Sequence, residues 1–247
     1  MVDKKWYINL GLVLVIVSVI VYSLQMLIFR RYDETGFYLL QDLAFVPVQV
    51  LLVMLIIDRL LRKKEKEAML GKLNMLIGVF FNEVGTGLMG LFMQCMRDAD
   101  EFTQRLGING NWSEKDFADA CSFLKTHQYR LECPVNMLSE MRQYLLERRN
   151  YLSLLLQNPN LLEHDTFTDL LWSVFHLADE LYHRRLPADL PATDLEHLYG
   201  DIGRACGLVM TEWLEYMKHL KEHYPYLYSI QVRTNPFNPQ AGVMITD

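Results

Sequence analysis

Two long uncharged stretches near the start of the chain constrain its fold more than any other feature. Residues 6–29 contain no Asp, Glu, Lys or Arg, and residues 37–57 contain one charged residue, Asp42. An α-helix rises about 1.5 Å per residue, so roughly 20 apolar residues cross the hydrocarbon layer of a membrane. Both stretches reach that length, and a short polar loop separates them. The sequence therefore predicts a transmembrane helical hairpin over residues 1–66, with spans at about 6–29 and 37–57.

The first stretch also has features of a signal peptide, because Lys4 and Lys5 precede it. Its apolar part is longer than the core of about 7–15 residues that is typical of signal peptides. No small-x-small cleavage site follows it, and residues 25–31 are mostly bulky. We therefore predict that the first stretch is an uncleaved membrane anchor.

The basic residues beside the two stretches predict the orientation of the hairpin. Arg30 and Arg31 lie in the connecting loop and count against the orientation given below. Lys and Arg near the ends of spans favour the cytoplasmic side of a membrane. Most of the Lys and Arg residues near the spans therefore predict a multi-pass protein of the inner (cytoplasmic) membrane with both termini in the cytoplasm. The basic residues on this predicted cytoplasmic side are Lys4, Lys5, Arg59, Arg62, Lys63, Lys64 and Lys66.

Four polar residues inside the spans form a stripe if the two helices are antiparallel. With position 30 opposite position 37, Gln25 lies level with Asp42, and Ser18 lies level with Gln49. The two residues on each helix are seven positions apart and therefore share one face. A polar partner reduces the cost of placing Asp42 in lipid. We predict that the stripe holds the hairpin, or two hairpins, together; an ion or proton path through Asp42 and Gln49 is the alternative.

The rest of the chain, residues 67–247, is long enough for one domain with its own core. It holds 15 Lys and Arg against 24 Asp and Glu, a net charge of −9. An acidic surface repels phosphate backbones, so we expect no nucleic-acid partner. The cysteines are scattered without a C-x-x-C pair, which favours reduced thiols over a disulfide framework or a zinc site. They are Cys95, Cys121, Cys133 and Cys206.

Most of this second part follows helical periodicity. Apolar residues recur at three- and four-residue intervals over 166–182 and over 194–220, which predicts two amphipathic helices. Further helices are predicted after Pro134 and from Ser113, because these residue types are common where helices begin. We predict an all-α chain in which the transmembrane hairpin precedes a cytosolic helical bundle over residues 67–233.

Three local features complete this prediction. Thr166 and Asp169 have the spacing of a capping pair at the start of a helix. Residues 227–232 favour a short extended segment, the one strand that the sequence suggests. Residues 234–247 contain proline and glycine and are predicted to form a flexible tail.

Residues 73–96 are apolar enough to suggest a third span. They contain one charged residue, Glu83, but also Asn, Gln and four glycines, so the segment is less hydrophobic than the first two stretches. We expect it to continue the second span as a long helix, buried among other helices or lying on the membrane surface. Its sequence Gly85-x-Gly87-x-x-Gly90 matches a dinucleotide-binding motif, but no strand pattern surrounds it. Close packing between helices is the preferred interpretation of these glycines.

A metal site is suggested by Glu180-x-x-His183, with His176 one turn before Glu180. Di-metal helical bundles need two such Glu-x-x-His elements, and the second is missing because Glu215 is followed by His219 at a spacing of four. A solvated polar face is therefore the preferred interpretation. His176, Glu180 and His183 remain the candidate ligands if the chain is a metal-binding enzyme. No nucleophile motif is present, so we predict neither a catalytic residue nor a cofactor.

Short segments of the chain resemble a group of uncharacterised prokaryotic two-span membrane proteins. These segments are residues 41–48, 73–78, 224–227 and 235–237. The resemblance implies no activity. We therefore predict a membrane-anchored helical protein that acts as a scaffold or signal relay. Its expected partners are the lipid bilayer and either a second copy of the chain or a cytosolic protein. The alternatives are a helical-bundle metal enzyme that uses the His/Glu cluster and a small transport or channel component.

Overall fold

The structure is a computed structural model that describes residues 4–30, 32–159, 161, 164–184, 190–238 and 241–242. The chain divides into two compact units, Met1–Lys66 and Glu67–Asp247.

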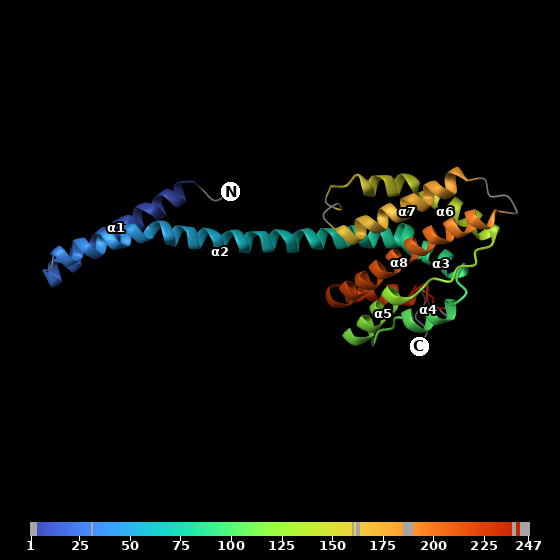
Figure 1. Cartoon of the computed structure of the whole chain (residues 1–247). Coiled ribbons are helices and arrows are strands. Elements are labelled where there is room, and N and C mark those ends of the chain that lie inside the picture. Colours follow the sequence, from blue (N-terminus) through green and yellow to red (C-terminus); the bar gives the residue numbers. More distant parts are fainter. Residues whose placement is uncertain are drawn as a thin grey trace. The chain divides into compact units, whose positions relative to one another are not determined.

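The described residues confirm the all-α class. They contain helices and connecting segments, and their β-type pairing is an isolated antiparallel bridge between Met96 and Leu131. Figure 1 labels the helices from α1 to α8. The helices are α1 (Lys4–Phe29), α2 (Tyr32–Phe80), the π-helix η1 (Phe81–Gly85), α3 (Thr86–Gln94), α4 (Ala99–Leu106), α5 (Glu114–Thr126), α6 (Val135–Leu156), α7 (Asp165–His183), α8 (Ala192–His223) and α9 (Pro225–Arg233).

The first unit consists of α1 and the first part of α2. Helix α1 ends where Arg30 adopts the left-handed conformation (φ 48°), which stops the helix and reverses the chain direction. Nearly all the apolar side chains described between Leu12 and Leu61 are exposed in the isolated chain. By length and composition the Glu34–Glu65 part of α2 is able to cross a membrane, and no residue of its most apolar window is buried. The described apolar part of α1, Leu12–Ile28, is shorter.

Helix α2 continues without interruption past the apolar segment to Phe80, as expected for residues 73–96. The π-helix η1 and then α3 follow it directly. Leu73–Gln94 also has the length and composition of a span, but 56% of its most apolar window is buried. Other helices of the second unit therefore cover much of this segment.

Helices α7 and α8 form the largest helix pair of the second unit, and residue numbers show that they are antiparallel. Arg184 contacts Asp194, whereas Thr166 contacts Glu212. The start of one helix therefore lies beside the end of the other. Aromatic side chains fill the core around the pair: the Phe80 and Phe167 rings lie 5.4 Å apart. Such edge-to-face contacts add to the stability gained from burial.

Glycines allow other helices to approach η1 and α3 closely. A Cβ atom on Gly87 would lie 2.3 Å from the Tyr144 hydroxyl oxygen, and one on Gly78 would lie 2.6 Å from the Tyr216 hydroxyl oxygen. A Cβ on Gly85 would meet the Phe81 ring at 2.4 Å. Gly90 has open space around it. The structure thus supports packing between helices at Gly87, whereas the close contact at Gly85 is with a side chain of the same π-helix.

Two local predictions about helix ends were wrong. The N-cap of α7 is His164, whose Nδ1 accepts a hydrogen bond from the Phe167 amide, so Thr166 lies inside the first turn. Residues 227–232 belong to helix α9 rather than to an extended segment. Pro225 in the first turn of α9 favours the helix, since its fixed φ suits that position.

The prediction of reduced thiols was wrong for two of the four cysteines. A disulfide joins Cys95 to Cys133, and both residues are buried. Backbone hydrogen bonds run beside it, from Glu132 N to Cys95 O and from Arg97 N to the carbonyl of residue 130. Cys121 and Cys206 are free thiols, and burial raises the pKa of Cys206 well above its ordinary value.

The predicted flexible tail begins with residues that are packed into the core. Asn235 and Phe237 are buried, and the Phe237 ring lies 5.1 Å from that of Trp213. The Asn235 side chain donates to the Leu106 carbonyl. The tail prediction is therefore wrong for these residues, and positions 239–240 and 243–247 lie outside the described residues.

Candidate functional site

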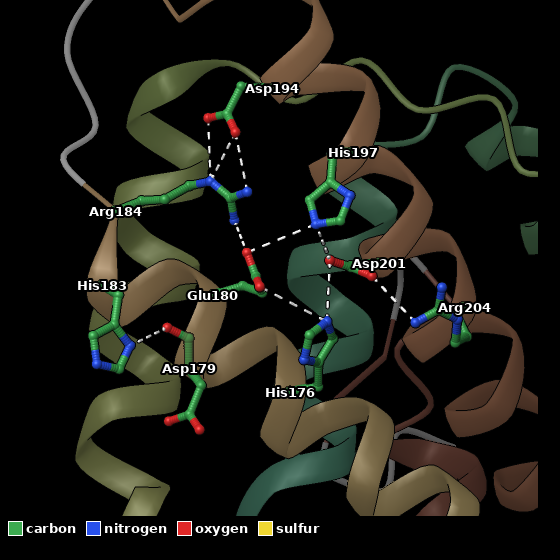
Figure 2. A network of polar contacts seen from close by, with 9 residues as sticks. All are labelled: His176, Asp179, Glu180, His183, Arg184, Asp194, His197, Asp201 and Arg204. Carbon is green, nitrogen blue, oxygen red and sulfur yellow. Dashed lines mark hydrogen bonds and ion pairs between the residues drawn. The ribbon is translucent and has the colours of Figure 1, made fainter.

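Histidine and carboxylate side chains from α7 and α8 converge where the two helices face one another. His176 and Glu180 are one turn apart on α7, and His197 and Asp201 are one turn apart on α8. Because the helices are antiparallel, the two pairs meet, and Figure 2 shows their polar ends directed toward one another. We call these four residues the His/carboxylate cluster.

The distances within the cluster are short. His176 Nε2 lies 3.5 Å from Asp201 Oδ2 and 3.9 Å from Glu180 Oε1. His197 Nε2 lies 3.3 Å from the same Asp201 oxygen and 3.8 Å from Glu180 Oε2. Asp201 is 3% exposed, whereas the imidazoles are 47% and 55% exposed. The cluster therefore has a buried carboxylate at its base and opens to solvent on the histidine side.

Two arginines hold the outer oxygens of the carboxylates. Arg184 donates to Glu180 Oε2 and also to both oxygens of Asp194. Arg204 donates to Asp201 Oδ1 over 3.2 Å. Asp201 thus has one oxygen bound to an arginine and the other facing both imidazoles, whereas Glu180 Oε2 lies near both Arg184 and His197, and Glu180 Oε1 faces His176. These contacts fix the orientation of the carboxylates, as outer-shell partners do at metal sites.

The structure brings together two of the three ligands suggested by the sequence. His183 lies apart from the cluster in Figure 2, and its Nδ1 is 2.9 Å from the Asp179 backbone carbonyl. The sequence interpretation missed His197 and Asp201, because it searched for Glu-x-x-His elements. In both helices a histidine is followed four residues later by a carboxylate. This repeated spacing identifies the pairs His176/Glu180 and His197/Asp201.

A second His/carboxylate group lies at the start of α4. His127 Nε2 is 2.8 Å from Asp98 Oδ2, and Glu101 lies nearby. The His127 ring is also packed against the ring of Phe102, at 4.8 Å. This packing and the direct contact with Asp98 account for the position of His127 in the core.

Glu212 is a buried acid on the same face of α8 as the core. It accepts a hydrogen bond from the Thr166 hydroxyl and lies 3.9 Å from His164 Nε2. Burial raises the pKa of Glu212, and the His164 and Thr166 contacts oppose that shift. The group joins the start of α7 to α8.

In the hairpin, the structure gives Asp42 a partner that the sequence interpretation did not consider. The Tyr22 hydroxyl donates a 2.9 Å hydrogen bond to Asp42 Oδ2. Ser18 and Gln25 line the same cavity of about 460 Å³ as Asp42, whereas Gln49 is not among its lining residues. Gln25 is nearly one helical turn from Tyr22, so both lie on the face of α1 that meets Asp42.

Comparisons with known proteins match nearly the whole chain. Residues 2–61 match a family model described as the N-terminal helical domain of MJ1433, and residues 69–233 match the C-terminal helical domain of uncharacterized protein MJ1433. The relative from Methanocaldococcus jannaschii, uncharacterized protein MJ1433, is 39% identical over 245 residues, which cover 99% of this chain and 98% of the relative. No solved structure matches the chain. The chain therefore belongs to the MJ1433 family of helical proteins.

Proposed function

We propose that the chain is a membrane-anchored helical protein whose second unit acts at the membrane surface by binding another protein. In this proposal α1 and the first part of α2 cross the inner membrane as a hairpin. The helical unit lies on the cytosolic side, where it serves as a scaffold or signal relay.

The observation that carries the proposal is the contrast in burial between two apolar segments. None of the most apolar window within Glu34–Glu65 is buried, whereas 56% of the corresponding window in Leu73–Gln94 is covered by other helices. Exposed apolar patches on soluble monomers rarely exceed a few hundred Å². A hairpin with continuous apolar exposure needs lipid or a partner to cover it.

The hydrogen bond between Tyr22 and Asp42 supports a packing role for the polar residues of the hairpin. Inside a membrane such a bond satisfies a group that lipid leaves without a partner. The contact therefore favours an anchor over the alternative of an ion path, because it gives Asp42 a hydrogen-bond partner within the hairpin.

Two observations disagree about the side of the membrane on which the helical unit lies. The Lys and Arg residues outside the spans favour the cytosol for both termini. The Cys95–Cys133 disulfide favours an oxidising compartment, since the cytosol keeps most thiols reduced. We propose the cytosolic side, because the positive-inside rule acts directly on short segments next to spans.

The experiment that tests the anchor is extraction of native membranes with alkaline carbonate. We expect the full chain to remain in the membrane pellet and to enter solution only with detergent. A matched variant that carries Leu14→Lys and Val17→Lys in the first span and Leu52→Lys and Leu55→Lys in the second places two charges in each span, and we expect it to lose membrane retention. A wild-type chain that stays dispersed without detergent would contradict the anchor.

A reporter fused to the C-terminus tests the orientation. We expect a fluorescent protein that folds in the cytosol to be active there, and alkaline phosphatase, which needs an oxidising compartment, to be inactive. The opposite pattern would place the helical unit outside and would agree with the disulfide. Crosslinking in native membranes followed by mass spectrometry then identifies the protein partner or a second copy of the chain.

A further inference from the structure

The His/carboxylate cluster has the geometry of a site for a divalent transition-metal ion. We propose that His176, Glu180 and Asp201, whose donor atoms already converge, bind one ion such as Zn²⁺, and that the exposed His197 imidazole turns in to supply the fourth ligand. This inference does not depend on the proposed function, because it concerns only contacts between α7 and α8.

The spacing of the donor atoms supports a tetrahedral site. Zn²⁺ binds imidazole nitrogen and carboxylate oxygen at about 2.0–2.2 Å, which places neighbouring ligand atoms about 3.3–3.6 Å apart. His197 Nε2 and His176 Nε2 lie 3.3 and 3.5 Å from Asp201 Oδ2. His176 Nε2 lies 3.9 Å from Glu180 Oε1, whereas His197 Nε2 lies 3.8 Å from the other Glu180 oxygen, Oε2. Rotation of the two exposed imidazoles is therefore needed to bring both nitrogens to one ion.

The buried oxygen of Asp201 is a second, independent indication of a ligand. Asp201 is 3% exposed, and its Oδ2 accepts no hydrogen bond from the described residues. A buried carboxylate oxygen without a donor costs free energy, so such groups are normally satisfied by a partner. This oxygen points toward the imidazole nitrogens in Figure 2, where a metal ion would lie between them.

The arginine contacts fit a metal site better than a simple network of ion pairs. Arg184 and Arg204 bind the outer oxygens of Glu180 and Asp201, and they leave Glu180 Oε1 and Asp201 Oδ2 for the ion. Both imidazole nitrogens lie within 3.5 Å of Asp201 Oδ2, the oxygen that Arg204 does not bind. Two nitrogen and two oxygen ligands favour Zn²⁺ or Fe²⁺ over Mg²⁺ or Ca²⁺, which prefer oxygen.

The test uses the full chain in detergent, without a histidine tag, after removal of metal with a chelator. We expect isothermal titration to show one Zn²⁺ per chain with a micromolar or lower Kd. Co²⁺ as a spectroscopic probe should give the intense visible absorption of four-coordinate cobalt. Zn²⁺ should also raise the Tm, because it binds the folded state.

Three variants make the test specific. His197→Gln and Asp201→Asn should each weaken Zn²⁺ binding by more than about 100-fold, since even outer-shell changes cost about 10–100-fold. His183→Gln is the matched control: it removes an exposed histidine from the same helix outside the cluster and should leave the affinity unchanged. His197 is 55% exposed, so its variant should fold even if Asp201→Asn does not.

Two results would overturn the proposal. One is Zn²⁺ binding only at millimolar concentration in the wild-type chain. The other is equal loss of affinity in His183→Gln and His197→Gln, which would indicate adventitious binding by surface histidines. Either result leaves the membrane anchor intact, because carbonate extraction does not involve this cluster.

Discussion

The Tyr144 hydroxyl donates a 2.8 Å hydrogen bond to the Val84 carbonyl oxygen, inside the π-helix that joins α2 to α3. Arg148, one turn later on α6, donates to the neighbouring Glu83 carbonyl over 2.7 Å and stacks on the Tyr144 ring. A π-helix displaces the regular hydrogen bonds of the backbone. Helix α6 therefore supplies side-chain donors at the irregular turn, and Gly87 leaves room for the tyrosine to reach it.

Substituting Gly87→Ala should destabilise the helical unit by about 1–3 kcal/mol, because the new Cβ displaces the Tyr144 hydroxyl from its carbonyl partner. Gly90→Ala is the matched control on the same helix, where a Cβ meets open space. It should be neutral or stabilising by up to about 1 kcal/mol, as expected for glycine to alanine in a helix. Urea unfolding followed by circular dichroism compares the two. Equal effects would contradict the close approach of α6.

Removing the disulfide with Cys95→Ser and Cys133→Ser should lower the free energy of unfolding by about 4 kcal/mol. The estimate follows from the entropy of the unfolded loop that the bond closes, with 38 residues of separation. Cys121→Ser, at a free thiol, should have a small effect. Alkylation of the unfolded chain without reductant should modify two thiols, and with reductant all four. Four modified thiols without reductant would show that the bond is absent.

Glu212 should make stability depend on pH in the acid range. Burial raises its pKa in the folded chain, so the folded state binds a proton more tightly than the unfolded state. The free energy of unfolding should therefore fall as the pH rises from the ordinary glutamate pKa through the raised one. Glu212→Gln, which keeps the acceptor for Thr166, should remove this component. Urea titrations at several pH values measure it, and an identical pH profile in the variant would contradict the assignment.

Asp42→Leu should leave membrane insertion intact and loosen the contact between α1 and α2, because it removes the acceptor of the Tyr22 hydrogen bond. Cysteines placed at Gln25 and Tyr38, which line the same cavity as Asp42, report on the contact through crosslinking. The crosslinking yield should fall in the Asp42→Leu background. Asp58→Leu, outside the cavity, serves as the control. An unchanged yield would show that Asp42 does not hold the helices together.

The helical class and most helix boundaries were predictable because each depends on local pattern. Residues 166–182 and 194–220 repeat apolar residues with helical spacing, and Ser113 caps α5 through a complete capping box. The cap of α7 was missed because histidine is an uncommon N-cap, and residues 227–232 were misassigned because β-branched and aromatic residues outweighed Pro225.

The His/carboxylate cluster could be predicted only in part, since it depends on which helices are neighbours. The sequence placed His176 beside Glu180, because both lie on α7. It did not relate them to Asp201, because only the antiparallel packing of α8 brings that residue to the same point. The Cys95–Cys133 bond was missed for the same reason: 38 residues separate its ends.

Phe237 has a practical consequence for studies of this chain. Its ring packs against the buried Trp213 ring at 5.1 Å, although it lies beyond the last helix. A chain shortened at Arg233 would uncover the Trp213 indole. Its lower stability would then be a result of the truncation itself. Tags and reporters therefore belong after Asp247, where the added sequence leaves the Phe237 ring in place.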